Sequence, residues 1–233
     1  MARESFAYLA EFTMGWLQMP RLAKQADRYL AIEGVDLILE GLKKKKGAML
    51  ILSHGGHWEA AALIAGLLIA RPAQTRIHAL ARPLKNPYLY RYILRLRGLT
   101  GLQSISKVGA VRETLKCLKR NEIVSLLFDQ RVNQGSVEVT FFGRPALTTS
   151  LPALVALRAG TPLFYVHTRL TPELRYVLNV KGPLPVEETG EADRDLRVNT
   201  QRFNDYLEAE IRKAPGRWLW MHNRWRVRHG AKE

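Results

Sequence analysis

Short apolar runs alternate along the chain with stretches of mixed apolar and polar residues. Each run has the length of a buried strand rather than the periodicity of a long amphipathic helix. The pattern predicts strands over Ala48–Ser53, Thr75–Ala81, Glu122–Phe128, Pro162–Arg169 and Leu174–Val180. Helical spacing between most of them predicts helices over Trp58–Ala70, Pro87–Arg97, Val108–Arg120, Ser150–Ala159 and Arg194–Ala214. Such alternation indicates an α/β fold with a mixed, largely parallel sheet flanked by helices.

The chain is expected to fold as one unit. Its 233 residues, 47% of them hydrophobic, suffice for a single sizeable core. The polar segment Pro185–Asp193 is interpreted as a loop before the last helix rather than as a domain boundary. We therefore expect a single domain over residues 1–233, with a helical N-terminal segment, 1–45, and a core, 46–228.

The N-terminal segment mixes apolar and basic residues over Ser5–Tyr29 and is interrupted by Pro20. This composition is typical of an amphipathic helix or a helix pair broken at the proline. Two interpretations remain open, because the segment can dock on a membrane surface or simply pack on the sheet. The longest nearly apolar run, Ala60–Ala70, is far below the roughly 20 residues that span a bilayer, and no signal peptide is visible. The sequence predicts no transmembrane helix.

The net charge of the chain indicates which kinds of partner it binds. Lys plus Arg number 36 against 21 Asp plus Glu, which gives a formal net charge of +15. The expected partners are anionic: phosphate-bearing lipids, an acidic carrier protein or nucleic acid. The single cysteine, Cys117, excludes an internal disulfide and a cysteine-based metal cluster, and it fits a reducing compartment.

The most informative polar stretch follows the first predicted strand and reads His54-Gly55-Gly56-His57-Trp58-Glu59. The two glycines allow a sharp turn into the next helix, which places His54 at the strand end. We expect the turn to bring Glu59 to one ring nitrogen of His54, so that the other nitrogen takes a proton from a hydroxyl. The alternative is that His54 and His57 are ordinary loop histidines and that Glu59 is an acid in the first turn of the helix, stabilised by the helix dipole. The position of His54 at the strand end favours a catalytic role, since open α/β sheets bind ligands at the carboxyl ends of their strands.

Two further strand ends carry polar residues. Arg82 follows the second predicted strand, where a guanidinium suits a phosphate. Asp129, Gln130 and Arg131 follow the third. If the strands are parallel, these side chains emerge at the same edge of the sheet as His54.

Aromatic residues raise two more alternatives. Phe141 and Phe142 belong either to a loop that lines an apolar slot or to the core. The segment 215–226 packs three tryptophans among three arginines, a mixture that suits a membrane surface or, by stacking, nucleic acid.

Taken in order, these elements resemble the late (lauroyl or myristoyl) acyltransferases of lipid A biosynthesis, a branch of the lysophospholipid and glycerol-3-phosphate acyltransferases. The resemblance spans about residues 46–228. It rests on His54-x4-Glu59, Arg82-Pro83 with Asn86, Asp129-Gln130, Phe141-Phe142-Gly143 with Thr148-Thr149, Pro162, and the run from Ala214 through Trp218-Leu219-Trp220-Met221-His222 to Arg224-Trp225.

The resemblance implies an O-acyltransferase of glycerol-3-phosphate acyltransferase-like fold. Its donor is an acyl thioester on acyl carrier protein or coenzyme A, its acceptor a lipid or glycolipid hydroxyl, and no metal or redox cofactor is expected. Carried over by residue, His54 is the general base and Glu59 its orienting partner, while Arg82 positions a phosphate. Asp129 and Gln130 shape the site. The oxyanion donors are either backbone N–H groups near Gly55-Gly56 or an arginine.

The remaining expected substrate contacts include two departures from the family pattern, His57 and Arg131. His57 adds a second imidazole where relatives often carry another residue, and Arg131 stands where the lipid A enzymes often have an acid. The full set of expected substrate-binding residues is Arg82, Asp129, Gln130, Arg131, Gly55, Gly56, His57, Phe141 and Phe142.

Those enzymes usually begin with a membrane-spanning helix, and this chain starts after that point. We therefore expect peripheral attachment to an anionic membrane at the cytoplasmic face of the bacterial inner membrane, and no nucleic-acid partner. Two alternatives stay open: a noncatalytic module that binds anionic lipid or nucleic acid, and a hydrolase of lipids or acyl thioesters. The latter would lack a serine elbow, because no G-x-S-x-G motif is present.

Overall fold

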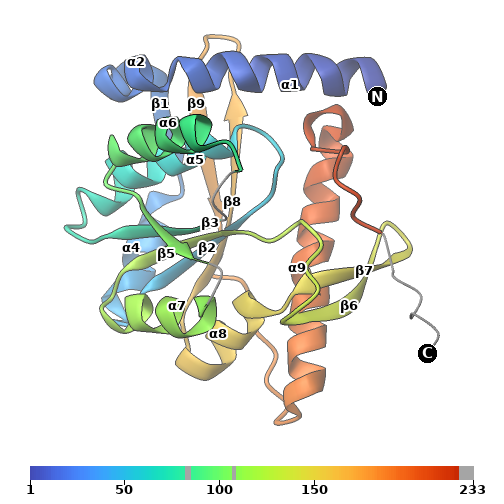
Figure 1. The fold of residues 1–233 in the computed structure, drawn as a ribbon. Helices are drawn as coiled ribbons and strands as arrows, with labels where there is room; N and C mark the ends of the chain where they lie inside the picture. Colours follow the sequence, from blue (N-terminus) through green and yellow to red (C-terminus); the bar gives the residue numbers. More distant parts are fainter. Residues whose placement is uncertain (82–84, 107–108, 226–233) are drawn as a thin grey trace.

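The computed structural model describes residues 1–81, 85–106 and 109–225 (Figure 1). Within these ranges the main sheet has seven strands in the order β1-β9-β8-β2-β5-β3-β4. Strands β8, β2, β5, β3 and β4 run parallel, β9 is antiparallel to β8, and β1 is parallel to β9. The strand bounds are β1 Leu30–Glu33, β2 Ala48–Leu52, β3 Ile77–Ala81, β4 Gln103–Ser106, β5 Ile123–Leu127, β8 Leu163–Leu170 and β9 Tyr176–Lys181.

Helices cover both faces of this sheet, which confirms the expected α/β architecture. Strand β2 shows why, since all five of its residues are buried. Its Leu50 packs in a core cluster with α4 and α5, whereas its Ile51 packs in a second cluster with α7, α8 and α9. A strand buried on both faces requires helices on both. The helix bounds are α4 Val35–Lys43, α5 Trp58–Ile64, α6 Pro87–Gly98, α7 Ala110–Lys119, α8 Leu151–Ala159 and α9 Ala192–Lys213.

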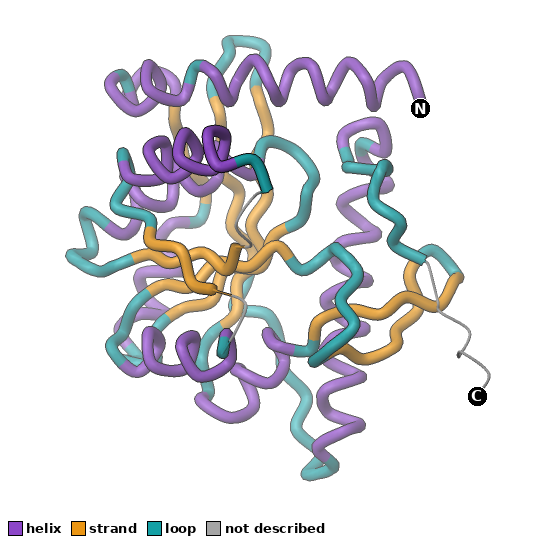
Figure 2. The backbone as a smooth tube through the Cα atoms, viewed as in Figure 1, coloured by secondary structure: helices purple, strands orange, loops and turns teal. Residues whose placement is uncertain are grey.

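The sequence pattern misses a two-stranded hairpin, β6 (Ser136–Phe141) and β7 (Arg144–Thr149), which lies beside α9 and apart from the main sheet (Figure 2). Phe142 and Gly143 form its two-residue turn, with φ of 50° and 71°. Left-handed backbone at both positions is the geometry of a tight hairpin turn. Of the two interpretations left open, the core position holds for Phe141, which ends the strand β6 and is fully buried, whereas Phe142 lies in the turn.

The predicted helix over Trp58–Ala70 consists of two helix types. It is an α-helix to Ile64 and a π-helix, η1, over Ala65–Ala70. Gly66 in η1 lies against Thr100, where a Cβ would approach the Thr100 Cβ to 2.5 Å. Only glycine permits this close contact between η1 and the segment after α6.

The N-terminal segment, 1–45, begins with three helices, α1 (Ala2–Leu17), α2 (Met19–Lys24) and α3 (Ala26–Tyr29). It also contains α4 and the strand β1 of the main sheet, so the expectation of a wholly helical segment is wrong. Pro20 lies in the first turn of α2, so the expected break near this proline is confirmed. Helix α1 packs on the turn after β2, because the Tyr8 hydroxyl donates to the Gly56 carbonyl (2.6 Å) and Phe12 stacks on Trp58. In the part of the chain that the structure describes, no helix is long and apolar enough to cross a membrane.

Candidate active site

The parallel register of β2 and β5 brings His54 and Asp129 together. The register pairs Leu52 with Leu127, the last residues of the two strands, and His54 and Asp129 each follow two residues later. The Nδ1 atom of His54 lies 2.7 Å from Oδ1 of Asp129. The other carboxylate oxygen accepts the His54 backbone N–H (2.7 Å) and the Trp218 indole N–H (2.8 Å). This arrangement places the ring proton on Nδ1 and leaves Nε2 as the basic atom.

Asp129 is held as a carboxylate although it is buried. Burial by itself raises the pKa of Asp129, but the hydrogen bonds and charge of His54 and the bond from Trp218 outweigh it and lower that pKa overall. The ionised side chain orients the imidazole and stabilises the imidazolium that forms when Nε2 takes a proton.

Glu59 does not occupy the position expected for it. Its carboxylate pairs with Arg97 of α6, at 2.8 Å from Nη2 and 3.4 Å from Nε. Both side chains are largely buried and line the same cavity as His54. The expected hydrogen bond between Glu59 and His54 is wrong, because the first turn of α5 points Glu59 toward α6. The partner of His54 is instead Asp129, which follows β5.

The Gly55-Gly56 turn is closely packed and its N–H groups are engaged. Gly55 donates to Ser53 Oγ (3.2 Å) and Gly56 to the Arg217 carbonyl (3.1 Å). Gly56 has φ +59°, and a Cβ there would lie 2.0 Å from the Thr168 carbonyl oxygen. The turn therefore holds His54 in place. Of the two alternatives for the oxyanion donor, the N–H groups of Gly55 and Gly56 are engaged within the fold.

His57 is a structural residue in this arrangement. Its Nδ1 accepts the Ala60 N–H at the start of α5 (3.2 Å), and Nε2 donates to the Phe12 carbonyl of α1 (3.1 Å). Both ring nitrogens are thus used away from the cavity, and burial lowers the pKa of His57 to about 4. The second imidazole is not a competing base, and its expected contact with substrate is replaced by contacts with α1 and α5.

Replacing His57 with Asn should reduce the acid sensitivity of the fold. Because folded His57 stays neutral, protons bind preferentially to the unfolded chain between pH 6.5 and about 4, so stability falls as the pH drops through that window. The shift corresponds to about 3 kcal/mol in the free energy of unfolding. Asn still caps α5. Urea unfolding at pH 7 and pH 4 should show a smaller loss for His57→Asn, and parallel losses would contradict the assignment.

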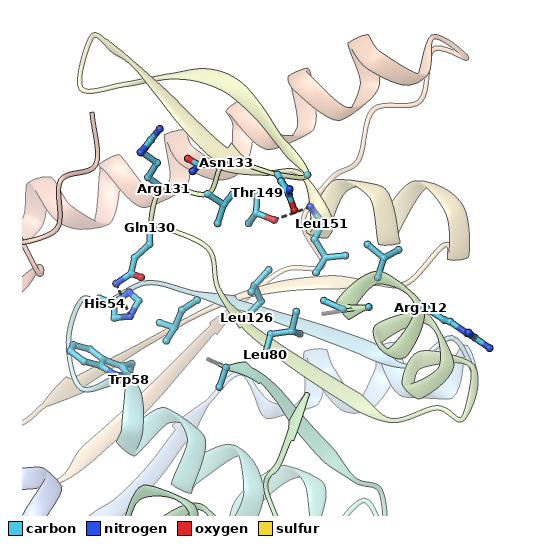
Figure 3. A pocket seen from close by; sticks show the side chains of 18 of the residues that line it. His54, Trp58, Leu80, Arg112, Leu126, Gln130, Arg131, Asn133, Thr149 and Leu151 are labelled. Carbon is cyan, nitrogen blue, oxygen red and sulfur yellow. Dashed lines mark hydrogen bonds between the residues drawn. The ribbon is translucent and has the colours of Figure 1, made fainter. Parts of the chain in front are cut away.

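A cavity of about 1540 Å³ opens beside His54. Leucines form its floor, among them Leu80, Leu126 and Leu151, while Arg131 and Asn133 lie on the opposite side (Figure 3). The Gln130 amide points at His54, with its nitrogen 3.4 Å from Nε2, so the basic atom of His54 faces this space (Figure 3). An apolar floor under a polar rim suits an amphiphile.

Two of the expected substrate contacts, Phe141 and Phe142, lie away from the cavity. Phe141 is fully buried and packs against Trp218 and Trp225, so it is a core residue. Phe142 lies in the hairpin turn beside Phe141, and neither phenylalanine lines the cavity. Arg82 lies outside the described residues.

One buried cluster has the ligand types of a metal site. Single ligand atoms of His78, Cys117 and Glu122 lie within 4.8 Å of one another. Glu122 already accepts hydrogen bonds from His78 Nε2 (2.8 Å) and from Arg120 (2.8 and 3.0 Å). The guanidinium occupies the place of a cation, so this cluster is a hydrogen-bonded link between β3 and the start of β5.

Comparison with known proteins shows the family to which the chain belongs. The family model "Bacterial lipid A biosynthesis acyltransferase" matches residues 1–227. A phosphatidylinositol mannoside acyltransferase of Mycolicibacterium smegmatis is 25% identical over 97% of this chain and 72% of its own length. One from Mycobacterium tuberculosis is 29% identical over 67% of this chain and 48% of its own length.

The crystal structure of the 1-acyl-sn-glycerophosphate acyltransferase PlsC from Thermotoga maritima aligns with 87% of this chain and 82% of its own, at 18% identity and a TM-score of 0.40. Because the family model covers nearly the whole sequence, the chain belongs to the bacterial lipid A biosynthesis acyltransferase family and is a lipid acyltransferase.

Proposed function

We propose that the enzyme moves a fatty acyl chain from a thioester of acyl carrier protein or coenzyme A to a hydroxyl of a lipid or glycolipid, with a His54–Asp129 pair as its base. The observation that carries this proposal is that Asp129 holds Nδ1 of His54 while Nε2 faces the cavity. This geometry meets the requirement for a general base that activates a hydroxyl without a protein nucleophile.

The proposed reaction begins when Nε2 of His54 takes the acceptor hydroxyl proton. The acceptor oxygen attacks the thioester carbonyl carbon and forms a C–O bond, and the carbonyl oxygen becomes an oxyanion. Collapse of this intermediate breaks the C–S bond, and the departing thiolate takes the proton from Nε2. The products are an ester and a free thiol, and His54 returns to its starting state.

Gln130 is the proposed donor to the oxyanion. Its amide nitrogen lies 3.4 Å from Nε2 of His54, so it is beside the atom around which the substrates assemble. The N–H groups of Gly55 and Gly56 are already engaged. A side-chain amide aimed at the developing charge is worth about 10²- to 10³-fold in rate in comparable sites.

Glu59 has a supporting role in this proposal. Its pairing with Arg97 joins the first turn of α5 to α6 at the cavity wall. Arg82, outside the described residues, is proposed to position a phosphate.

The N-terminal segment, 1–45, and the core, 46–228, are proposed to act as one unit at a membrane. Besides the Tyr8 contact, Glu11 of α1 forms an ion pair with Arg217. The face of α1 opposite these contacts exposes Phe6, Met14 and Leu17 by 70%, 57% and 56%. An apolar helix face on a strongly basic protein suits peripheral binding to an anionic bilayer. The proposed location is the cytoplasmic face of the inner membrane.

Changing Phe6, Met14 and Leu17 together to Ser should weaken membrane binding. Phosphatidylglycerol-containing vesicles in a flotation assay should carry the parent protein and much less of the triple variant, because burial of these side chains drives insertion. A matched control is Leu174→Ser, an exposed leucine (64%) in the loop between β8 and β9. Equal flotation of the parent and the triple variant would rule out this face as the contact.

The test of function is transfer from acyl carrier protein or acyl-coenzyme A to lipid acceptors, with products identified by mass. Because the relatives named above are phosphatidylinositol mannoside acyltransferases, the acceptors should include phosphatidylinositol mannoside as well as a lipid A precursor. A new acylated lipid supports the proposal and identifies donor and acceptor. Free fatty acid as the sole product with every acceptor would instead indicate a hydrolase.

A further inference from the structure

His222 lines the cavity and is not used by the proposed reaction. Its Nε2 accepts the Arg131 backbone N–H at 3.0 Å. Because neutral imidazole has one donor and one acceptor nitrogen, this bond fixes the proton on Nδ1. The side chain lines the cavity, and among the described residues Nδ1 has no hydrogen-bond partner. Burial lowers the pKa of His222, which keeps the ring in this neutral form at pH 7.

Arg131 adds a positive charge to the same part of the cavity. Its Nε atom is buried without a hydrogen-bond partner, and no carboxylate pairs with its guanidinium in the described part of the chain. A buried guanidinium nitrogen that stays unpaired is costly, and a ligand anion would supply the partner that the described residues do not. Arginine is well suited to the paired oxygens of a phosphate.

The backbone fixes where Arg131 and His222 lie relative to His54. Gln130 and Arg131 are consecutive, and the first is turned toward His54 while the second is turned away from it toward Asn133 (Figure 3). The segment that carries His222 is also held at His54, since the Leu219 N–H donates to the His54 carbonyl (3.1 Å). A substrate that presents one group to His54 therefore reaches Arg131 with a group further along.

We infer that Arg131 and His222 form a phosphate subsite at the rim of the catalytic cavity, which binds a phosphate ester oxygen of a substrate while another part of that substrate lies at His54. This inference rests on the proposed function only for the identity of the substrate. Two sources share the chemistry: the phosphodiester of an anionic acceptor lipid and the phosphate of the donor's phosphopantetheine arm.

The test is binding of two soluble probes to the full chain, glycerophosphoinositol for the acceptor and 4′-phosphopantetheine for the donor. Titration calorimetry gives the affinities, and the imidazole ¹⁵N resonances of the unmodified protein report on the Nδ1–H group of His222. Arg131→Gln should weaken binding of one probe by about 10- to 100-fold, and His222→Phe by about 2- to 10-fold. The matched control is Arg158→Gln, which removes an exposed charge on α8 outside the cavity.

The probe that loses affinity identifies the source of the phosphate. Equal binding of both probes to the parent, Arg131→Gln and Arg158→Gln proteins, with no shift of the His222 resonance, would overturn the subsite. If acyl transfer fails in every assay while binding still depends on Arg131, the proposed function fails and the subsite stands.

Discussion

Replacing His54 with Ala should lower acyl transfer by about a thousand-fold while the protein stays folded. The loss follows from removing the atom that takes the acceptor proton, since general-base catalysis contributes about 10²- to 10⁴-fold. The fold should survive because Asp129 keeps its bonds to the His54 backbone N–H and to Trp218. Initial rates with saturating donor and acceptor measure the effect, and circular dichroism confirms folding.

A matched histidine substitution separates chemistry from structure. His57→Asn alters the other imidazole of the same turn, whose ring nitrogens are bound to α1 and α5 rather than turned to the cavity. At pH 7 this variant should transfer acyl groups at a rate close to that of the parent. Near-normal turnover by His54→Ala would contradict the proposed mechanism. The reduced acid sensitivity expected of His57→Asn does not depend on that mechanism and would stand on its own.

The strand β2 and the turn that follows it were predictable because local rules govern both. A five-residue apolar run buried on both faces, followed by two glycines, allows few structures other than a central strand and a sharp turn. The same rules placed Asp129 at a strand end. They did not show which strands are neighbours, and the pairing of β2 with β5 is what makes Asp129 rather than Glu59 the partner of His54.

The spacing argument for Glu59 failed for a related reason. Four intervening residues permit a return toward His54, but the side chain of a helical residue is directed by the helix and by its neighbours. Arg97 lies 38 positions further on and offers Glu59 a charged partner at 2.8 Å. Its place beside α5 depends on how α6 packs, which no local pattern encodes.

The region from Phe141 to Trp225 shows the same limit for aromatic residues. The hairpin turn at Phe142-Gly143 was accessible in principle, because glycine in a two-residue turn is a local signal. The packing of Trp218 and Trp225 on Phe141, and the indole bond of Trp218 to Asp129, join segments about 80 to 90 positions apart. These tryptophans suggested a surface for lipid or nucleic acid, whereas Trp218 is buried and supports the candidate base.

Exchanging Asp129 for Asn should reduce transfer about 10²- to 10⁴-fold, which makes this carboxylate the sharpest test of the site. The amide nearly preserves the shape of the side chain. If its oxygen keeps the bonds to the His54 backbone and Trp218, its NH₂ group faces Nδ1 of His54. The ring then carries its proton on Nε2 and cannot take one from a hydroxyl. The turnover number should fall far more than the affinity for either substrate, as steady-state kinetics will show.

Glu59→Gln provides the decisive comparison, because the family spacing and the observed geometry disagree about which acid serves His54. Its neutral amide can still accept a bond from Arg97, so the expected loss of turnover is below about ten-fold. Glu187→Gln, which alters a partly exposed ion pair with Arg202, is the control for a changed charge. A silent Asp129→Asn together with an inactive, folded Glu59→Gln would reverse the assignment and make Glu59 the orienting acid. An inactive, folded Asp129→Asn together with a nearly normal Glu59→Gln would show that strand register, rather than spacing along the chain, selects the partner of His54.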